Sequence, residues 1–413
     1  MQKRFWVLFV LAVFSIITYL DRTSISITGS QITQDLHLSE KEFGWIMGSF
    51  AFAYGIFEIP VGLWGDFKGP KSVLFRIVLS WSLFTILTGF SYSFTMLFII
   101  RFLFGIGEAG AYPNATIVVA RWFPKQEAGR AQSFIWIASR IGAALAPFLS
   151  IYIMSIWGWR YVFYIFGGLG VVWAVFWVYW FQNEPKDMPG IQEAELAHIE
   201  LGREVKVPQN NLAVFLKIIK TPNVWALMSM YHCLLYGAYF YLSWMPKYLK
   251  NGKGVDDAHI AFLASLPFIL GTIGCFSGGF LSDFIARKKG LKWGRRSVGM
   301  FGLVMSGCCM LSSTFIGDPT ISIVILAFGL AFKDFTLPVS WATSADIGGQ
   351  HSGIVAGAMG MAGQLGSTIM SIAFGYILAA TGSWDMPVRI IGLVVILGGF
   401  LWLRINPEKK IVF

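Results

Sequence analysis

The stretch GLWGDFKGPK, at Gly62–Lys71, has a counterpart later in the chain. GFLSDFIARKK, at Gly279–Lys289, repeats its leading glycine, its Asp-Phe pair and its basic end. Each stretch follows an apolar segment of the length that crosses a membrane, which needs about 20 residues. The repeat therefore predicts a chain built twice from one helical unit, with Asp66 and Asp283 in matching positions.

The composition is that of an integral membrane protein. Of 413 residues, 56% are hydrophobic and 13% are charged, and soluble domains carry about twice that charged share. The 45 glycines and 17 tryptophans are typical of membrane helices that pack through small residues and end in aromatic belts. The apolar run after the N-terminal MQKR lacks a small-residue cleavage site, so we interpret it as an uncleaved first span.

Apolar segments of membrane-spanning length occur twelve times. They cover residues 5–34, 43–64, 72–91, 95–121, 130–154, 160–181, 222–249, 259–285, 297–316, 320–345, 352–379 and 386–405. A long polar stretch, residues 182–221, separates six segments from six. The predicted fold class is therefore an all-α membrane protein with twelve transmembrane helices in two six-helix halves, residues 1–181 and 222–413, joined by a cytoplasmic linker.

The formal net charge of +10 follows the predicted topology. With a cytoplasmic N-terminus, 22 of the 32 lysines and arginines fall in inner segments and six in outer ones. The positive-inside rule then predicts that both termini are cytoplasmic. The excess charge is explained by orientation in the lipid bilayer, and it does not indicate a nucleic-acid partner.

Several short motifs resemble sites of other classes but have the wrong context. GIGEAG, at Gly105–Gly110, matches a dinucleotide fingerprint but lies within an apolar helix, so we expect its glycines to allow close helix packing. The pairs Gly274/Gly278 and Gly353/Gly357 suggest the same role. The five histidines lack metal-ligand spacing, and catalytic signatures are absent. We expect no enzyme activity, no metal and no cofactor.

Eight ionisable residues fall within predicted spans, four of each sign, and burial of charge favours mutual pairing. They are Asp21, Arg22, Glu58, Arg101, Glu108, Arg140, Lys333 and Asp334. A carboxyl group in a low-dielectric environment has a raised pKa and can exchange a proton near neutral pH. An arginine stays charged and offers a planar fork that fits a carboxylate.

These properties predict a site that couples protons to an organic anion. Asp21 and Glu108 are the candidate proton carriers, and Arg22 and Arg140 are the candidate carboxylate ligands. The alternative is a set of static ion pairs that lock helices together. Arg101 remains open between the two roles. The static role is favoured for the Lys333-Asp334 pair. It is also favoured for Glu58, although Glu58 could instead act in gating together with Asp66.

Aromatic and amide side chains add candidate contacts. Tyr236 and Tyr239 recur at helical spacing in YHCLLYGAYFYLSWMPKYL, and Tyr54 lies in an earlier span. Tyrosines that face a cavity can donate hydrogen bonds to sugar hydroxyls, although packing is their commoner role.

The chain resembles the major facilitator superfamily and, within it, the anion:cation symporter family of bacterial hexuronate, glucarate and galactonate transporters and vesicular glutamate transporters. The resemblance rests on GLWGDFKGPK, YLDRTSISI, RFLFGIGEAGAYPNA, YGAYFYLSWMPKYL and PVSWATSADIGGQHSGIVAGAMG. It implies proton-driven uptake of an organic anion, with Asp21 and Glu108 as proton carriers and Arg22 as substrate ligand. The loop motif and its repeat imply gating roles for Asp66, Lys71 and Asp283. We place Arg101 among the candidate gating residues as well.

The chain departs from this family pattern at several positions. Gly360 stands where an asparagine is common, and Gln364 offers an amide nearby. Arg140 stands where many relatives have a neutral polar residue, and Glu58 replaces a common glutamine. We therefore predict a monomeric inner-membrane importer of a sugar acid or similar anion, with a uniporter, an exporter and a non-transporting nutrient sensor as alternatives.

Overall fold

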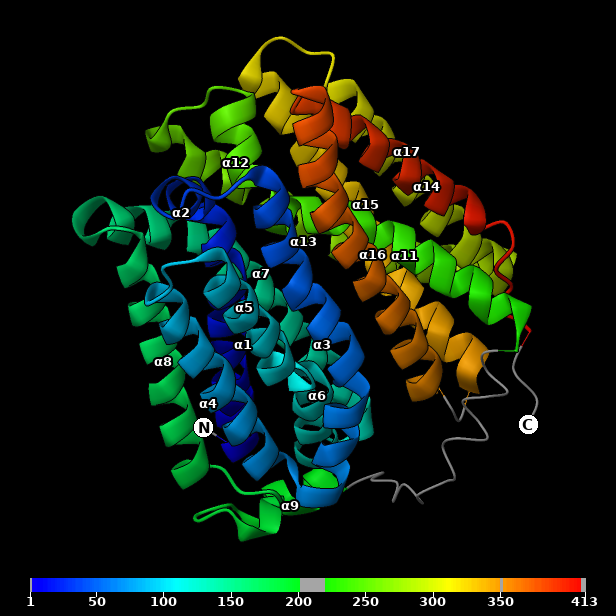
Figure 1. Ribbon diagram of the computed structural model, residues 1–413. Helices are drawn as coiled ribbons and strands as arrows, with labels where there is room; N and C mark the ends of the chain where they lie inside the picture. Colours follow the sequence, from blue (N-terminus) through cyan, green and yellow to red (C-terminus); the bar gives the residue numbers. More distant parts are fainter. Residues whose placement is uncertain (1, 201–219, 350–351, 410–413) are drawn as a thin grey trace. The chain divides into compact units, whose positions relative to one another are not determined.

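The computed structural model describes residues 2–200, 220–349 and 352–409 (Figure 1). Within these ranges every regular element is helical, and twelve long segments follow one another. They are α1 with α2 (Lys3–Ile27, Gly29–Asp35), α3 (Glu40–Lys68), α4 (Pro70–Gly89), α5 with α6 (Phe94–Glu108, Ala111–Trp122), α7 (Lys125–Trp157), α8 (Trp159–Trp180), α11 with α12 (Pro222–Ser243, Met245–Lys247), α13 (Asp257–Lys289), α14 (Leu291–Ser313), α15 (Pro319–Gly348), α16 (Ser352–Thr381) and α17 (Asp385–Leu401). The predicted all-α class and the order of the twelve segments are confirmed.

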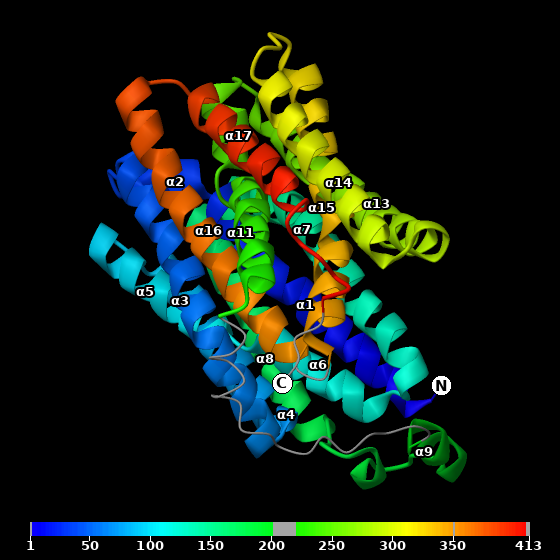
Figure 2. The ribbon, with the colours of Figure 1, turned by 90° about the vertical axis from the view of Figure 1, so that its right-hand side faces the viewer.

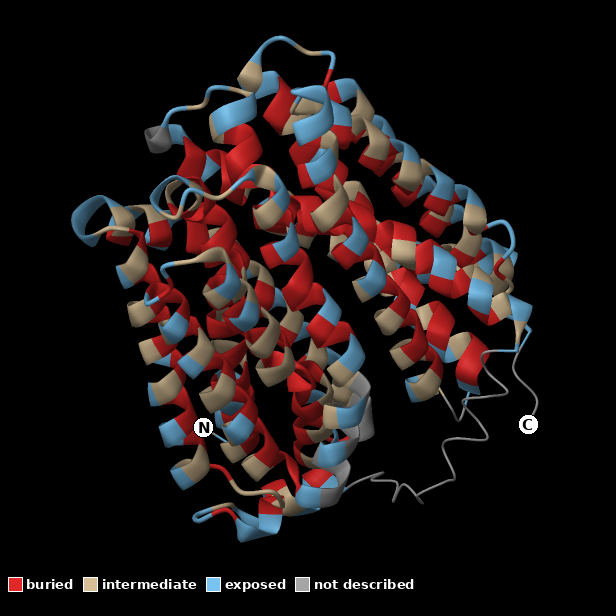
Figure 3. Ribbon diagram, in the orientation of Figure 1, coloured by how far each residue is buried: buried red, intermediate tan, exposed pale blue. Residues whose placement is uncertain are grey.

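The outer faces of these helices suit a lipid environment. In the described part of the chain, eight helices are long and apolar enough to cross a membrane by length and composition. Buried and exposed residues alternate along the helices (Figure 3), yet the exposed ones include large apolar side chains such as Phe276 and Phe280, at 81% and 71% exposure. An apolar surface of this kind is stable against lipid and costly against water.

Packing divides the chain into two compact units. The first unit consists of Met1–Ser24 and Ile56–Pro208, and the second of Ile25–Gly55 and Gln209–Phe413. The helices α1 and α3 therefore each contribute to both units. The predicted halves at residues 1–181 and 222–413 remain a prediction.

In the first unit, α8 packs closely against α4. A Cβ atom on Gly167 of α8 would lie 2.7 Å from the carbonyl oxygen of Ser82 in α4, so only glycine allows this approach. The start of α1 is held by α9 (Glu193–Glu200), where the carboxylate of Glu195 accepts hydrogen bonds from the backbone N–H groups of Lys3 and Arg4. A carboxylate at this position satisfies donors that a helix start leaves unpaired.

In the second unit, α13, α14 and α15 lie side by side in both ribbon views (Figures 1 and 2). Cβ atoms on Gly274 and Gly278 of α13 would lie 2.1 Å and 1.9 Å from the carbonyl oxygens of Ala331 and Phe335 in α15. The predicted close-packing role of these two glycines is confirmed. It is wrong for Gly353, whose added Cβ would meet nothing within 4 Å among the described residues.

Substitution of Gly278 by alanine is expected to destabilise the protein by about 1–3 kcal/mol, because the methyl group forces α13 away from α15. Gly279→Ala is the matched control, since its Cβ would be in ordinary contact, 3.6 Å from Pro338. Thermal unfolding of the detergent-solubilised variants measures the difference. Equal midpoints for the two variants would contradict the close contact.

The first half of α3 packs on α16 within the second unit. Cβ atoms on Gly44 and Gly48 would lie 2.7 Å from the carbonyl oxygen of Ser371 and 2.8 Å from a side-chain carbon of Ile372. An ion pair continues this contact at the start of α3, where the buried Lys247 Nζ lies 2.6 Å from Glu40 Oε2. Without a hydrophobic driving force between helices in lipid, such close contacts and ion pairs provide the cohesion.

Candidate functional site

An ion pair joins α1 to α5 inside the first unit. The Nε atom of Arg22 donates a hydrogen bond to Oε1 of Glu108, and the two side chains are 10% and 1% exposed. The guanidinium carbon of Arg22 lies 5.5 Å from the ring centroid of Tyr19 and 5.9 Å from that of Tyr112. The predicted pairing of buried charges is confirmed here. An arginine held by one carboxylate between two rings is arranged to accept the carboxylate of a ligand instead.

Tyr112, one of the two rings beside Arg22, is held in place by hydrogen bonds and by ring stacking. The hydroxyl groups of Tyr112 and Ser15 lie 3.0 Å apart, and the Ser15 hydroxyl donates to the carbonyl oxygen of Ile135 at 2.9 Å. The ring of Tyr112 stacks on Trp136 at 4.8 Å between centroids. Our sequence reasoning missed these residues. The sequence gives no direct signal for Tyr112, because the chain turns at Ala109–Gly110 and helical spacing from Glu108 does not apply across the turn.

Asp21 and Arg101 complete the charged cluster. Asp21, next to Arg22 in α1, is 1% exposed, and the charges that act on its carboxyl group are those of Glu108 and Arg101 in α5. Arg101 is also 1% exposed, with its guanidinium carbon 4.4 Å from the ring centroid of Phe104, and its charge acts on Glu108 as well. The cluster thus contains two positive and two negative side chains from two helices.

The helix that carries Glu108 breaks immediately after it. We predicted one continuous span over residues 95–121, but α5 ends at Glu108 and α6 begins at Ala111. Ala109 is non-helical and Gly110 has φ = +77°, a left-handed conformation that favours glycine. The last glycine of GIGEAG therefore makes a turn, in addition to the packing role that we predicted for the motif. Broken helices are a common way to line a binding site at membrane depth.

Four predicted substrate contacts lie in the second unit. Tyr236 and Tyr239 of α11 are 7% and 6% exposed, and Tyr54 of α3 is 3% exposed. Gln364 of α16 approaches Gly55, where an added Cβ would lie 2.6 Å from the Gln364 Cβ. Among the described residues, Oε1 of Gln364 is buried and has no hydrogen-bond partner. The amide is thus available to a ligand.

Comparison with known families identifies the class of protein. Residues 11–369 match the family model described as Major Facilitator Superfamily. The chain belongs to this family. Membership confirms the prediction of a multi-pass membrane transporter rather than an enzyme.

Relatives and solved structures agree with this superfamily. A Cupriavidus necator protein named as a probable sulfoacetate transporter is 30% identical, and the match covers 98% of this chain and 94% of the relative. An Escherichia coli K12 protein named as a probable galactarate/D-glucarate transporter is also 30% identical, over 99% and 94%. The expected resemblance to bacterial sugar-acid transporters is confirmed. A crystal structure of a bacterial Spinster homologue has the same fold, with a TM-score of 0.75, 17% identity and coverage of 97% and 96%.

Two of the predicted gating residues, Lys71 and Asp283, make polar contacts with side chains of other segments. Nζ of Lys71 donates to Oε1 of Gln182 at 3.1 Å, which links the start of α4 to the residues after α8. Nη1 of Arg295 lies 2.7 Å from Oδ1 of Asp283, and its Nε lies 3.0 Å from Oδ2 of Asp346, so one arginine joins α13, α14 and α15. The side chain of Asp66 lies outside the described residues.

The remaining predicted charges lie on α15, α7 and α3. Lys333 and Asp334 of α15 form an ion pair and are 4% and 0% exposed, which supports the static role that we favoured for them. Arg140 of α7 and Glu58 of α3 are partly buried. Nδ1 of His232 lies 3.0 Å from the carbonyl oxygen of Ala362, so this histidine has a polar partner.

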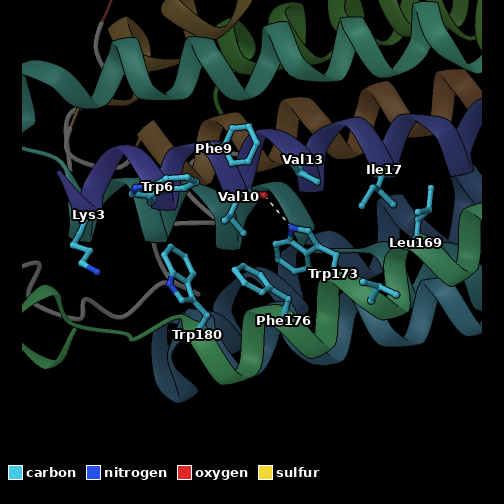
Figure 4. A pocket seen from close by; sticks show the side chains of 11 residues that line it. Lys3, Trp6, Phe9, Val10, Val13, Ile17, Leu169, Trp173, Phe176 and Trp180 are labelled. Carbon is cyan, nitrogen blue, oxygen red and sulfur yellow. Dashed lines mark hydrogen bonds between the residues drawn. The ribbon is translucent and has the colours of Figure 1, made fainter. Parts of the chain in front are cut away.

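An apolar groove runs between α1 and α8 on the first unit (Figure 4). Its volume is about 630 Å³, and Trp6, Phe9, Trp173 and Phe176 are among its lining residues. The indole N–H of Trp173 donates to the carbonyl oxygen of Val10 at 2.9 Å. The groove is lined almost entirely by apolar side chains, so it offers little to an anion and suits the hydrocarbon chains of lipids.

Proposed function

We propose that the protein imports a small organic anion, of the sugar-acid class, together with protons. The observation that carries this proposal is the buried ion pair between Arg22 and Glu108. Protonation of Glu108 removes the negative charge that pairs with Arg22, whereas the guanidinium group keeps its own charge. The substrate carboxylate then takes the vacated position on the arginine, so that proton binding and anion binding favour each other.

The substrate class is supported by two further features. Relatives that match nearly the whole chain are named for galactarate, glucarate and sulfoacetate transport, and all three compounds are small carboxylates. Tyr236 and Tyr239 are buried, Gln364 is half-buried with a buried Oε1 atom, and all three can form hydrogen bonds with the hydroxyl groups of a sugar acid. Arg140 and Tyr54 are the other side chains that we propose as substrate ligands.

The proposed transport cycle is alternating access. The halves at residues 1–181 and 222–413 rock against each other and alternately expose the bound anion to the two sides of the bacterial inner membrane. Both termini are cytoplasmic, in keeping with the distribution of basic residues. Asp21 and Glu108 carry the protons, and a monomer is sufficient because the two halves come from one chain.

The experiment is uptake by the purified protein in proteoliposomes with an imposed pH gradient, acidic outside. Glucarate, galactarate, galactonate, glucuronate and sulfoacetate are compared, with and without a protonophore, and with sodium replaced by choline. We expect accumulation of at least one sugar acid above equilibrium, its loss with the protonophore, and no requirement for sodium. Liposomes without protein provide the background.

Other outcomes identify the alternatives. Uptake that equilibrates but never exceeds the outside concentration, and that ignores the protonophore, indicates a uniporter. Binding of a panel compound without flux indicates a sensor. Accumulation that requires sodium overturns the proposed coupling ion.

A further inference from the structure

The apolar groove between α1 and α8 carries a charge at one end. Among its described lining residues only Lys3 is charged, and its side chain stands beside the tryptophans at that end (Figure 4). The sides of the groove include Phe9 and Phe176, which are exposed, whereas Val10 and Trp173 are buried. The groove thus has a buried floor and exposed apolar sides, and it opens to the lipid that surrounds the protein.

The floor of the groove is held in place by its own contacts. The hydrogen bond from the indole of Trp173 to the carbonyl oxygen of Val10 joins α8 to α1. The same ring system packs on Phe14, with centroids 5.3 Å apart, and stacks on Trp177, with centroids 5.0 Å apart. An indole fixed on several sides cannot swing outward to fill the groove, so the space is a lasting feature of this surface.

The length of the groove matches one leaflet of a bilayer. At 1.5 Å per residue, the lining extends about 21 Å along α1, from Lys3 to Ile17, and about 16 Å along α8, from Trp180 to Leu169. Half of a bilayer measures about 15 Å across its hydrocarbon and about 20–22 Å with the headgroup region included. Lys3 lies at the Trp180 end and Ile17 at the Leu169 end (Figure 4). The groove can therefore follow an acyl chain from the headgroup region to the middle of the bilayer.

The residues at the Lys3 end are those of a membrane interface. Trp6 and Trp180 line this end of the groove, and tryptophans are enriched at the level of lipid headgroups. Ile17 and Leu169, at the other end, are purely apolar. A lysine at the interface packs its hydrocarbon stem on apolar surface and places its ammonium group among the headgroups.

The charge of Lys3 is available to a ligand. In the described ranges its ammonium group has neither an ion pair nor a hydrogen bond, whereas the neighbouring Arg4 is paired with Glu127 at 2.8 Å. The nearby carboxylate of Glu195 is bound by the backbone N–H groups at the start of α1. A Cβ atom on Gly190 would lie 3.8 Å from Nζ of Lys3, so glycine at this position leaves the ammonium group uncovered on that side.

We propose that this groove binds an anionic phospholipid, with one acyl chain between α1 and α8 and its phosphate group at Lys3. The apolar lining accounts for the chain, and the positive charge at the interface accounts for the headgroup. The predicted cytoplasmic N-terminus places the groove in the inner leaflet, where basic residues attract anionic lipids. The site is independent of the transported anion and of proton coupling, although α1 also carries Asp21 and Arg22.

The test compares two lipids on the full-length protein in detergent. Dioleoylphosphatidylglycerol and dioleoylphosphatidylcholine have the same acyl chains and differ in net charge, and native mass spectrometry measures the affinity of the first lipid bound. We expect the anionic lipid to bind about fivefold more tightly, which is the contribution of one lysine near an anionic headgroup. Lys3→Gln should remove this preference. Lys186→Gln is the matched control, because Lys186 is exposed and follows α8 by six residues but does not line the groove.

A second variant tests the place of the acyl chain. Val172 is an exposed lining residue, so Val172→Trp fills the groove without disturbing a buried side chain, and it should weaken binding of both lipids. Val175→Trp, at an exposed position of α8 outside the lining, should leave both affinities unchanged.

Three results would overturn the proposal. They are equal affinities of the two lipids for the parent protein, an unchanged preference in Lys3→Gln, and unchanged lipid binding in Val172→Trp. Glycerol 1-phosphate, which is the headgroup without a chain, is expected not to compete with the bound lipid. Competition at concentrations similar to those of the lipid would assign Lys3 to a free phosphate compound instead.

Discussion

Replacement of Glu108 by glutamine is expected to abolish accumulation of the anion against its gradient while counterflow exchange continues. The amide keeps the shape of the side chain but can neither release nor accept a proton. The carboxylate that pairs with Arg22 in the structure is thereby removed permanently. Arg22 can therefore bind the substrate carboxylate at any pH, and the variant exchanges substrate across the membrane without accumulating it. Uptake driven by a pH gradient and exchange at symmetric pH are measured in the same liposomes.

Glu127→Gln is the matched control. Glu127 also pairs with an arginine, with its Oε2 atom 2.8 Å from Nη1 of Arg4, but its side chain is 32% exposed. We expect this variant to accumulate substrate at near the original level, because Glu127 lies in the first turn of α7, outside the charged cluster of α1 and α5. Intact accumulation in Glu108→Gln would remove Glu108 from the coupling role.

Replacement of Arg22 by lysine is expected to weaken anion binding by about 10- to 100-fold. Lysine keeps the positive charge but loses the planar fork that binds a carboxylate through two hydrogen bonds. A hydrogen bond to a charged group contributes about 1.5–3 kcal/mol, and 1.4 kcal/mol is a factor of ten in affinity. Calorimetric binding at acidic pH and the KM for uptake both report this loss.

The control for this second prediction is Arg76→Lys. Arg76 is exposed, and its guanidinium carbon lies 5.1 Å from the ring centroid of Trp64. It belongs to α4, whereas the charged cluster consists of residues of α1 and α5. We expect its affinity to match the parent protein. An unchanged affinity in Arg22→Lys would assign the substrate carboxylate to another cation and leave Arg22 as a static partner of Glu108.

The helices and the principal charges were predictable from the sequence. An apolar run of membrane length has few alternatives to a helix, because every backbone polar group must find a partner within the segment. Charges are so costly at such positions that Asp21, Arg22 and Glu108 stand out by their location alone. Mutual pairing of the buried charges was predicted, but the choice of Arg22 as the partner of Glu108 comes from the structure.

Uncharged polar residues and glycines could not be singled out from the sequence in this way. Threonines and serines occur throughout membrane helices, where most donate to a carbonyl oxygen of their own helix, as Thr88 does. The sequence alone therefore does not distinguish Thr85, whose hydroxyl group lacks that partner. Glycines are equally ambiguous, since Gly110 makes a turn, Gly278 permits a close contact and Gly353 does neither.

The membership of α1 and α3 in both units has a mechanical consequence. The boundary crosses α1 between Ser24 and Ile25 and α3 between Gly55 and Ile56. The hydroxyl group of Ser24 donates to the carbonyl oxygen of Asp21 at 2.9 Å, and Pro60 follows the α3 crossing by five residues. Both features are associated with bending of helices. Each helix can therefore bend near its crossing, and in α1 the bend lies three residues after Asp21, the side chain that we propose as a proton carrier.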